Sequence, residues 1–166
     1  MAVTATTGEI MERKWLAHYI DENFDSTSPS YTRLGEDLED YSIEMNADTE
    51  TKKNIIGANS VRVKGYEPQS SVDTFYAYEG DKLYTQLETI VNERHTGSKL
   101  RTTVVDVLVN SKGEVQWAYR EDVVVVPQSH GGDTAGIQIP FEIHYCGNRT
   151  KGTFDLETKS FTETKA

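Results

Sequence analysis

The side chains in this sequence that could carry out chemistry begin with its histidines and its cysteine. The histidines stand at His18, His95, His130 and His144, and none of them has a second ligand at the spacing of a zinc site. Cys146 lies two residues beyond His144, so on a strand the two side chains would share one face, where a base could activate a thiol. Because Cys146 follows an apolar strand, we interpret it as a core or strand-end residue, and we expect no metal site.

Two further groupings could support chemistry. Glu36, Asp37, Glu39 and Asp40 could supply a carboxylate pair for glycoside cleavage, but no aromatic platform is evident beside them, and such clusters are usually solvated. The glycine-rich segment 131–136 has neither a following helix nor the lysine of a phosphate-binding loop, so it predicts a tight connection. We therefore expect no enzyme activity and no cofactor.

The bulk composition indicates one folded domain. The chain of 166 residues is 36% hydrophobic, with 17 basic against 27 acidic residues and a net charge of -10, which disfavours nonspecific binding to DNA. We find no run of about 18 apolar residues that could span a membrane. The N-terminus lacks the pattern of a signal peptide. The single Cys146 excludes an internal disulfide and fits a reducing cytoplasm.

The elements that would position these residues are mostly strands. Residues 11–20 have strand composition. Residues 38–46 alternate, with Glu39, Tyr41, Ile43 and Met45 on one face. The opposite face is polar and acidic. Its members are Asp40, Ser42, Glu44 and Asn46.

Further strands are predicted over residues 60–66, 70–77, 102–110, 115–126, 137–145, 148–156 and 160–164. In the segment 137–145 we expect Ile137 and every second residue after it to point inward. The glycine of Ser111-Lys112-Gly113 predicts a hairpin turn.

One segment has helical periodicity. From residue 81 to residue 94 the apolar positions form the stripe of an amphipathic helix. Asp81 is the expected N-cap and Gly97 the expected stop. About eight strands and one helix predict a mainly β protein, an antiparallel sandwich or barrel with the helix covering an open side.

Residues 47–59 interrupt the strand pattern with a charged stretch that is long for a hairpin loop. Ile55 and Ile56 stand inside it, which predicts that this loop docks on something. The whole chain, 1–166, is then a single domain with a polar N-terminal arm at 1–10, this long loop and a polar C-terminal tail at 159–166, and we expect both ends to become ordered on assembly.

Four phrases in order carry a resemblance to a known family: DLEDYSIEMN, TETKKNIIGANSV, GYEPQSSVDTFYA and VVPQSHGGDTAGIQIPF. Together they cover much of the chain, which resembles the tail tube (major tail) proteins of long-tailed bacteriophages of Gram-positive bacteria. The resemblance implies a tail-tube-like fold in which subunits form hexameric rings, and stacked rings form a hollow tube for DNA ejection. It also implies residence in the virion tail after assembly in the host cytoplasm.

The resemblance implies partners and contact residues as well. The chain would assemble with itself, with a tape measure protein and with tail-tip or terminator proteins, while DNA passes through without specific binding. The strand 38–46 would line the lumen with Asp40, Ser42 and Glu44. Contacts between subunits or rings would come from the long loop, through Glu50, Lys52, Lys53, Ile55 and Ile56.

Three alternatives stay open. The chain could be the tube protein of a contractile tail or of a bacteriocin-like injection particle. It could be a carbohydrate-binding β-sandwich in which Trp15 and Trp117 supply stacking platforms. It could also be a hydrolase that uses Glu39 or Asp40.

Overall fold

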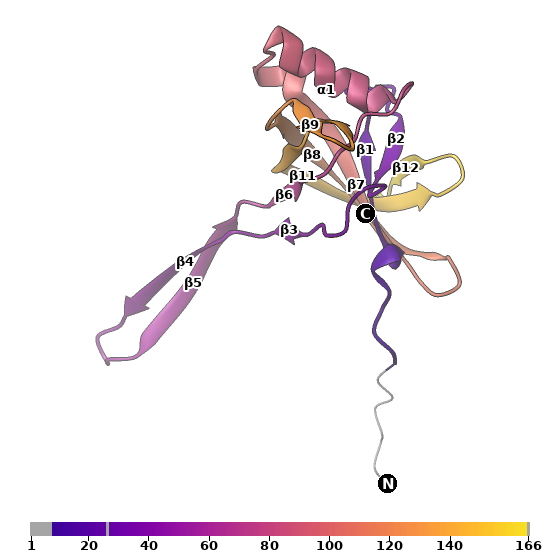
Figure 1. The fold of residues 1–166 in the computed structure, drawn as a ribbon. Helices are drawn as coiled ribbons and strands as arrows, with labels where there is room; N and C mark the ends of the chain where they lie inside the picture. Colours follow the sequence, from indigo (N-terminus) through magenta and orange to yellow (C-terminus); the bar gives the residue numbers. More distant parts are fainter. Residues whose placement is uncertain (1–7, 26, 166) are drawn as a thin grey trace.

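One antiparallel sheet of eight strands dominates the structure, a computed structural model that describes residues 8–25 and 27–165 (Figure 1). Along the sheet the strand order is β2-β1-β7-β8-β11-β6-β3, with β12 paired to β11. The bounds are β1 Leu16–Asp21, β2 Tyr31–Leu34, β3 Ile43–Glu44, β6 Gln69–Val72, β7 Arg101–Val109, β8 Val115–Pro127, β11 Phe141–Asp155 and β12 Ser160–Glu163.

Two smaller hairpins and three helical segments complete the fold. One hairpin joins β4 (Ala47–Lys53) to β5 (Asn59–Tyr66), and the other joins β9 (Gly131–Asp133) to β10 (Gly136–Gln138). The helix α1 spans Lys82–Glu93, and single 3-10 turns cover Arg13–Trp15 and Gly97–Leu100. The mainly β fold with one α-helix is therefore confirmed, as a curled sheet that forms half a barrel.

The sheet buries apolar side chains on both faces, which is why its central strands read as nearly continuous β-branched runs. On β7, for example, Val104 points into one cluster and Val105 into the other. The larger cluster lies under α1, which contributes Leu83 and Leu87. Its other fully buried members come mainly from the strands and include Ile20, Val72, Val123, Val125, Ile139, Phe141 and Ile143. The smaller cluster comprises Ala17, Tyr19, Tyr31, Val105, Val107, Ala118 and Phe154.

The helix follows the prediction closely. Asp81 is its N-cap, and the carboxylate accepts a hydrogen bond of 3.0 Å from the backbone N–H of Leu83. The predicted stop at Gly97 was wrong, because the helix ends at Glu93 and its C-cap, Arg94, adopts the left-handed conformation with φ of 56°. The backbone N–H of His95 then returns to the carbonyl of Ile90, which satisfies the final turn.

The strand predicted over residues 38–46 was wrong in length. Only Ile43 and Glu44 pair with β6, and Met45 is 50% exposed. The backbone before them bonds elsewhere, since the carbonyl of Tyr41 accepts from the guanidinium of Arg13 at 3.0 Å. Asn46 then turns the chain with φ of 46°. The predicted first strand is shortened in the same way, because residues 13–15 form a 3-10 turn.

The predicted loop over residues 47–59 was also wrong, since most of it is the strand β4. Seven residues of β4 pair with β5, from Ala47 opposite Tyr66 to Lys53 opposite Asn59. The charged residues of this segment suggested a loop. The opposite face of the strand carries threonines, which favour strands. Only residues 54–58 form a turn.

The inward position expected for Ile137 was wrong as well. Pro140 separates β10 from β11, and Ile137 is 55% exposed on the small hairpin while Ile139 and Phe141 are fully buried. Beyond this break β11 is a single strand of 15 residues with bulges near Gly147, and it absorbs the strand predicted over residues 148–156.

Both chain ends can be compared only in part. Residues 1–7 of the predicted N-terminal arm and Ala166 lie outside the described residues. Within the predicted C-terminal tail, residues 160–163 pair with β11 as β12 in the single chain. In the described part of the chain, no helix has the length and apolar character needed to cross a membrane.

Candidate assembly surface

The hairpin β4–β5 extends away from the rest of the molecule (Figure 1). Its base continues the edge of the main sheet, where β3 pairs with β6 and the strands then run on into β4 and β5. Two hydrogen bonds hold this base, one from the backbone N–H of Glu67 to the carbonyl of Met45 and one from the Asn46 amide to the carbonyl of Glu67. The hairpin is therefore anchored to the sheet at its base only.

The two faces of the hairpin differ in chemistry. On one face Thr51 lies opposite Val61 and Thr49 opposite Val63, and both valines are exposed. On the other face the carboxylate of Glu50 forms ion pairs with Lys52 at 3.5 Å and Lys64 at 3.6 Å. Arg62 lies directly opposite Glu50 on this face. The hairpin thus presents an apolar and threonine face and a charged face.

The tip of the hairpin is a hydrogen-bonded turn that exposes two isoleucines. The Asn54 side chain accepts from the backbone N–H groups of Ile56 and Ala58, and Gly57 adopts φ of 81°, which favours glycine. Ile55 is fully exposed and Ile56 is 83% exposed. Within the described chain nothing covers these two isoleucines, so their predicted docking on another surface stays a prediction.

Not one side chain of β4 or β5 is buried, so the hairpin has no core of its own. A two-stranded hairpin without packing against a third element is marginally stable in water. Exposed apolar surface that projects from a domain marks an interaction site. The hairpin is therefore the candidate contact surface of the described structure.

The structure places the predicted contact residues in two groups. Glu50 and Lys52 are engaged with each other on the charged face, where Glu50 is half-buried. Lys53, Ile55 and Ile56 lie at or beside the tip and are exposed. Whether these residues contact a neighbouring subunit stays a prediction.

The three predicted lumen residues lie together on one exposed surface. Asp40, Ser42 and Glu44 are all exposed, although only Glu44 belongs to a strand. They line a shallow recess of about 170 Å³ with residues of β6 and with Asp73. The surface is acidic, as expected for a face that repels phosphate, and its place in a lumen stays a prediction.

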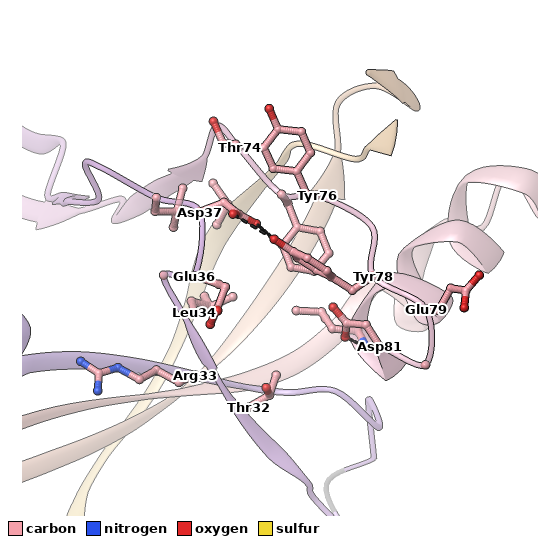
Figure 2. Close-up of a pocket in the computed structure, with 16 residues that line it drawn as sticks. Thr32, Arg33, Leu34, Glu36, Asp37, Thr74, Tyr76, Tyr78, Glu79 and Asp81 are labelled. Carbon is pink, nitrogen blue, oxygen red and sulfur yellow. Dashed lines mark hydrogen bonds between the residues drawn. The ribbon is translucent and has the colours of Figure 1, made fainter. Parts of the chain in front are cut away.

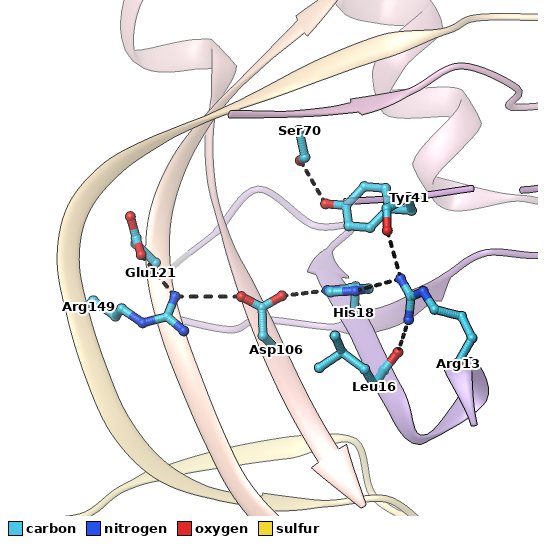
Figure 3. A network of polar contacts seen from close by, with 8 residues as sticks. All are labelled: Arg13, Leu16, His18, Tyr41, Ser70, Asp106, Glu121 and Arg149. Carbon is cyan, nitrogen blue, oxygen red and sulfur yellow. Dashed lines mark hydrogen bonds and ion pairs between the residues drawn. The ribbon is translucent and has the colours of Figure 1, made fainter. Parts of the chain in front are cut away.

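A polar network crosses the sheet near the start of β1 (Figure 3). Nδ1 of His18 lies 2.6 Å from a carboxylate oxygen of Asp106, and both side chains are buried. The other oxygen of Asp106 lies 3.6 Å from the guanidinium of Arg149, which also donates to Glu121 at 3.1 Å. The network links β1, β7, β8 and β11, so it fixes the register of the sheet.

The geometry of His18 does not suit a catalytic base. Its Nε2 lies 3.1 Å from Arg13, and because a guanidinium can only donate, Nε2 accepts and Nδ1 carries the hydrogen toward Asp106. A base that activates a nucleophile would instead present Nε2 to a hydroxyl or thiol. Arg13 also donates to the carbonyls of Leu16 and Tyr41, so it fastens the segment before β1 to the segment before β3.

The other candidate chemical groups are dispersed. His95 and His144 each lie beside a glutamate two residues away, and His130 is exposed next to Tyr84. In the described residues no group of three or more histidine, cysteine or acidic side chains could hold a metal ion. Cys146 is exposed within β11, at its bulge, so the interpretation as a core or strand-end residue was wrong.

The aromatic platforms proposed for a carbohydrate are only partly open to solvent. Trp15 and Trp117 are both half-buried, and the ring of Trp117 packs against Tyr119 with centroids 5.5 Å apart. The guanidinium of Arg149 lies over the same tyrosine at 4.6 Å. Trp117 and Tyr119 therefore pack beside Arg149 of the polar network.

Sequence reasoning missed the network of His18 and Asp106 because the two residues are 88 positions apart. A buried polar pair of this separation leaves no local pattern. The one available signal was Asp106, a single carboxylate in the apolar run TTVVDVLV, which predicts a buried partner.

Comparison with known proteins shows similarity in structure only. No protein-family model matches the sequence, and no curated protein matches it either. The fold is similar to that of the sheath/tube terminator of an extracellular contractile injection system, PVC, in its extended state, with a TM-score of 0.57 and 10% identity over 89% of this chain and 100% of that chain. A second structure, from the baseplate of the anti-feeding prophage, has a TM-score of 0.48 and 12% identity over 88% of this chain and 96% of that chain. The chain thus shares the fold of a terminator protein from a contractile injection system.

Proposed function

We propose that this chain is a structural subunit of a tail-like injection particle that assembles with copies of itself into rings. The observation that carries the proposal is the β4–β5 hairpin, which extends from a curled sheet and has no core of its own. The similarity to a terminator of a contractile injection system adds support, because it extends over the whole length of that protein.

A projecting arm explains why rings form. When an arm of one subunit binds a different surface of the next, the contact is heterologous, and repeated rotation closes a ring. In the family that the sequence resembles, six subunits close the ring. The free edges of the half-barrel, β2, β3 and β12, would then be covered by neighbours, which removes the hazard of exposed strand edges.

Charge supports a conduit. The chain carries a net charge of -10, and Asp40, Glu44 and Asp73 lie around one recess. An acidic lining lets DNA pass without releasing its counterions, so it does not hold the DNA. On this proposal the face at Asp40, Ser42 and Glu44 points into the lumen, and the particle's tail is the site of residence.

Negative-stain microscopy of the purified protein tests the proposal. We expect rings of uniform diameter, in stacks or singly, at concentrations well above the threshold for assembly. A protein that stays monomeric at high concentration, and that also fails to assemble on a tail-tip or tape-measure template, would contradict it.

Two positions in such a particle are compatible with ring formation, and the structural similarity favours one. A tube subunit repeats along the tail, whereas a terminator closes its end in one ring. Because the similar structure is a sheath/tube terminator, we propose a contractile or bacteriocin-like particle before a long non-contractile tail. Long tubes on a template would support the tube subunit, and single rings that stop tube growth would support the terminator.

A further inference from the structure

A groove lies beside α1 and the edge strand β2 (Figure 2). Its volume is about 390 Å³, within the range of sites that bind small ligands or side chains. Its walls come from the edge strand β2, from residues 35–38 and from the connection between β6 and α1. Three separate segments therefore converge on one opening.

The floor of the groove is apolar. Leu34, Val72 and Leu83 are buried there, and the half-buried side chains of Leu38 and Phe75 pack against the same cluster. This floor is the surface of the larger core itself. A side chain that enters the groove would therefore extend the hydrophobic core, which is favourable in proportion to the area it buries.

The rim of the groove is acidic and aromatic. Glu36, Asp37, Glu79 and Asp81 surround it, and Arg33 is the single basic residue among those that line it. The hydroxyl of the exposed Tyr78 donates to the carboxylate of Asp37 at 3.0 Å, which holds ring and carboxylate together at the mouth (Figure 2).

The Asp37 carboxylate also raises the pKa of Tyr78, first through this hydrogen bond. The phenol therefore stays a neutral donor, and the mouth keeps its aromatic ring and its negative charge side by side. A cation near this ring would gain from both.

The hairpin carries the complementary chemistry. Lys52, Lys53, Arg62 and Lys64 against Asp48 and Glu50 give it a net charge of +2, so the rest of the chain carries -12. The hairpin tip combines basic side chains with two isoleucines, and the groove combines an acidic rim with an apolar floor. On contact, the lysines would lie near the rim carboxylates and the isoleucines near the leucines and the valine of the floor.

The hairpin cannot reach the groove of its own chain. A strand of eight residues such as β5 spans about 26 Å, and Figure 1 shows the hairpin pointing away from α1 and β2. A tip that docks in this groove must therefore come from a second copy.

We propose that the hairpin tip of one subunit docks in the acidic groove of the next. Ile55 and Ile56 lie against the apolar floor, and Lys52 or Lys53 pairs with the rim carboxylates beside Tyr78. The contact joins two different surfaces, so it is heterologous and suits a ring. This inference rests on the proposed function and names the two surfaces that meet.

Disulfide trapping between full-length chains tests the contact. Two variants are made in a Cys146→Ser background, Ile56→Cys in the hairpin and Glu79→Cys at the groove. They are mixed under mild oxidation, and the linked peptides are identified by mass spectrometry. A docked tip holds the two thiols at an effective concentration far above that of the bulk, so we expect the hairpin–groove link to exceed the control by about tenfold or more.

The matched control replaces Glu79→Cys by Lys112→Cys, on the exposed turn between β7 and β8. It presents a thiol of similar accessibility far from the groove. Equal linking to Lys112→Cys and Glu79→Cys would overturn the proposal.

A charge exchange gives a second readout. Lys52→Glu with Lys53→Glu should weaken association by about tenfold, because the attraction between the basic tip and the acidic rim becomes repulsion. Adding Glu36→Lys with Glu79→Lys in the same chain should restore it. The control, Lys112→Glu with Lys151→Glu, changes the net charge equally at exposed positions elsewhere and should have no such effect. Failure of the exchange to restore association would overturn the pairing.

Microscopy of the same samples separates the two proposals. Rings without the hairpin–groove link overturn the groove contact and leave the proposed function standing. The link without rings supports the contact and contradicts ring formation. Absence of both rings and link contradicts both.

Discussion

Two hairpins of this molecule use the same backbone geometry in different ways. The β7–β8 hairpin lies in the middle of the sheet, where Val105, Val107 and Val123 are fully buried. The β4–β5 hairpin pairs its strands over seven positions, yet it has no buried side chain. The first hairpin builds the fold of one chain, and the second is free to join one chain to another. Burial, and not strand pairing, separates the two roles.

The sharpest test of this comparison places one charge in each hairpin. Val107→Asp should destabilise the chain by roughly 4 kcal/mol or more, because it buries an unpaired carboxylate. Val63→Asp, at an exposed position of β5, should change stability by less than about 0.5 kcal/mol. Urea denaturation followed by circular dichroism measures both. Similar losses of stability for the two variants would mean that the β4–β5 hairpin packs against the main sheet.

Removing a native carboxylate from the buried polar network, and one from the exposed hairpin, tests the same difference in burial. Asp106→Asn should cost about 3 kcal/mol, since it removes the buried carboxylate that accepts from His18, while Arg149 keeps its pair with Glu121. Glu50→Gln, which breaks the ion pairs of the exposed hairpin, should cost about 0.5 kcal/mol. Equilibrium unfolding at neutral pH compares the two. A small loss for Asp106→Asn would show that the network is dispensable for the fold.

The hairpin tip should behave in the opposite way, with a large effect on assembly and none on folding. Ile55→Asp with Ile56→Asp removes two side chains that would each contribute about 2 kcal/mol on burial, so assembly should weaken at least about tenfold. Sedimentation velocity measures assembly, and the unfolding midpoint measures folding. If the double variant unfolds, these isoleucines belong to the core.

The two regions also differ in how far the sequence could predict them. The helix was found because Asp81 and the spacing of Leu83, Leu87 and Ile90 are local signals. The turn at Gly113, with φ of 80°, and its flanking β-branched strands were found for the same reason. Local patterns of this kind reflect propensities that act within a few residues.

The errors arose where distant residues decide the structure. The strand expected through Tyr41 is interrupted because Arg13, 28 positions earlier, bonds to its carbonyl. The sequence predicts a loop in place of β4 because a strand exposed on both faces has no alternation between polar and apolar residues. In the candidate site, the importance of residues 47–59 was visible from Ile55 and Ile56, but the groove was not, since its walls come from three separate segments.

The smallest expected effect on stability comes from removing one tyrosine hydroxyl, either a buried one in the main sheet or an exposed one on the β4–β5 hairpin. The Tyr145 hydroxyl is buried without a hydrogen-bond partner in the described structure, and burial raises the pKa of this phenol well above its usual value. Tyr145→Phe should therefore raise stability at pH 7 by about 1 kcal/mol, because it removes an unsatisfied polar group. Tyr66→Phe, on the exposed hairpin, should leave stability unchanged.

The same pair of variants predicts how stability responds to alkali. Because the folded protein holds the Tyr145 phenol neutral, the stability from this group is complete below the pKa of the unfolded chain, about 10, and is lost as the pH rises above that value. Tyr145→Phe should therefore unfold less readily than the parent above pH 10, with the remaining loss due to Tyr31 and Tyr41, whose pKa values are also raised by burial. Urea midpoints between about pH 8 and pH 11 measure the difference. An identical loss of stability at alkaline pH in the parent and in Tyr145→Phe would show that this hydroxyl reaches water. Tyr145 would then be as accessible as the tyrosine of the hairpin.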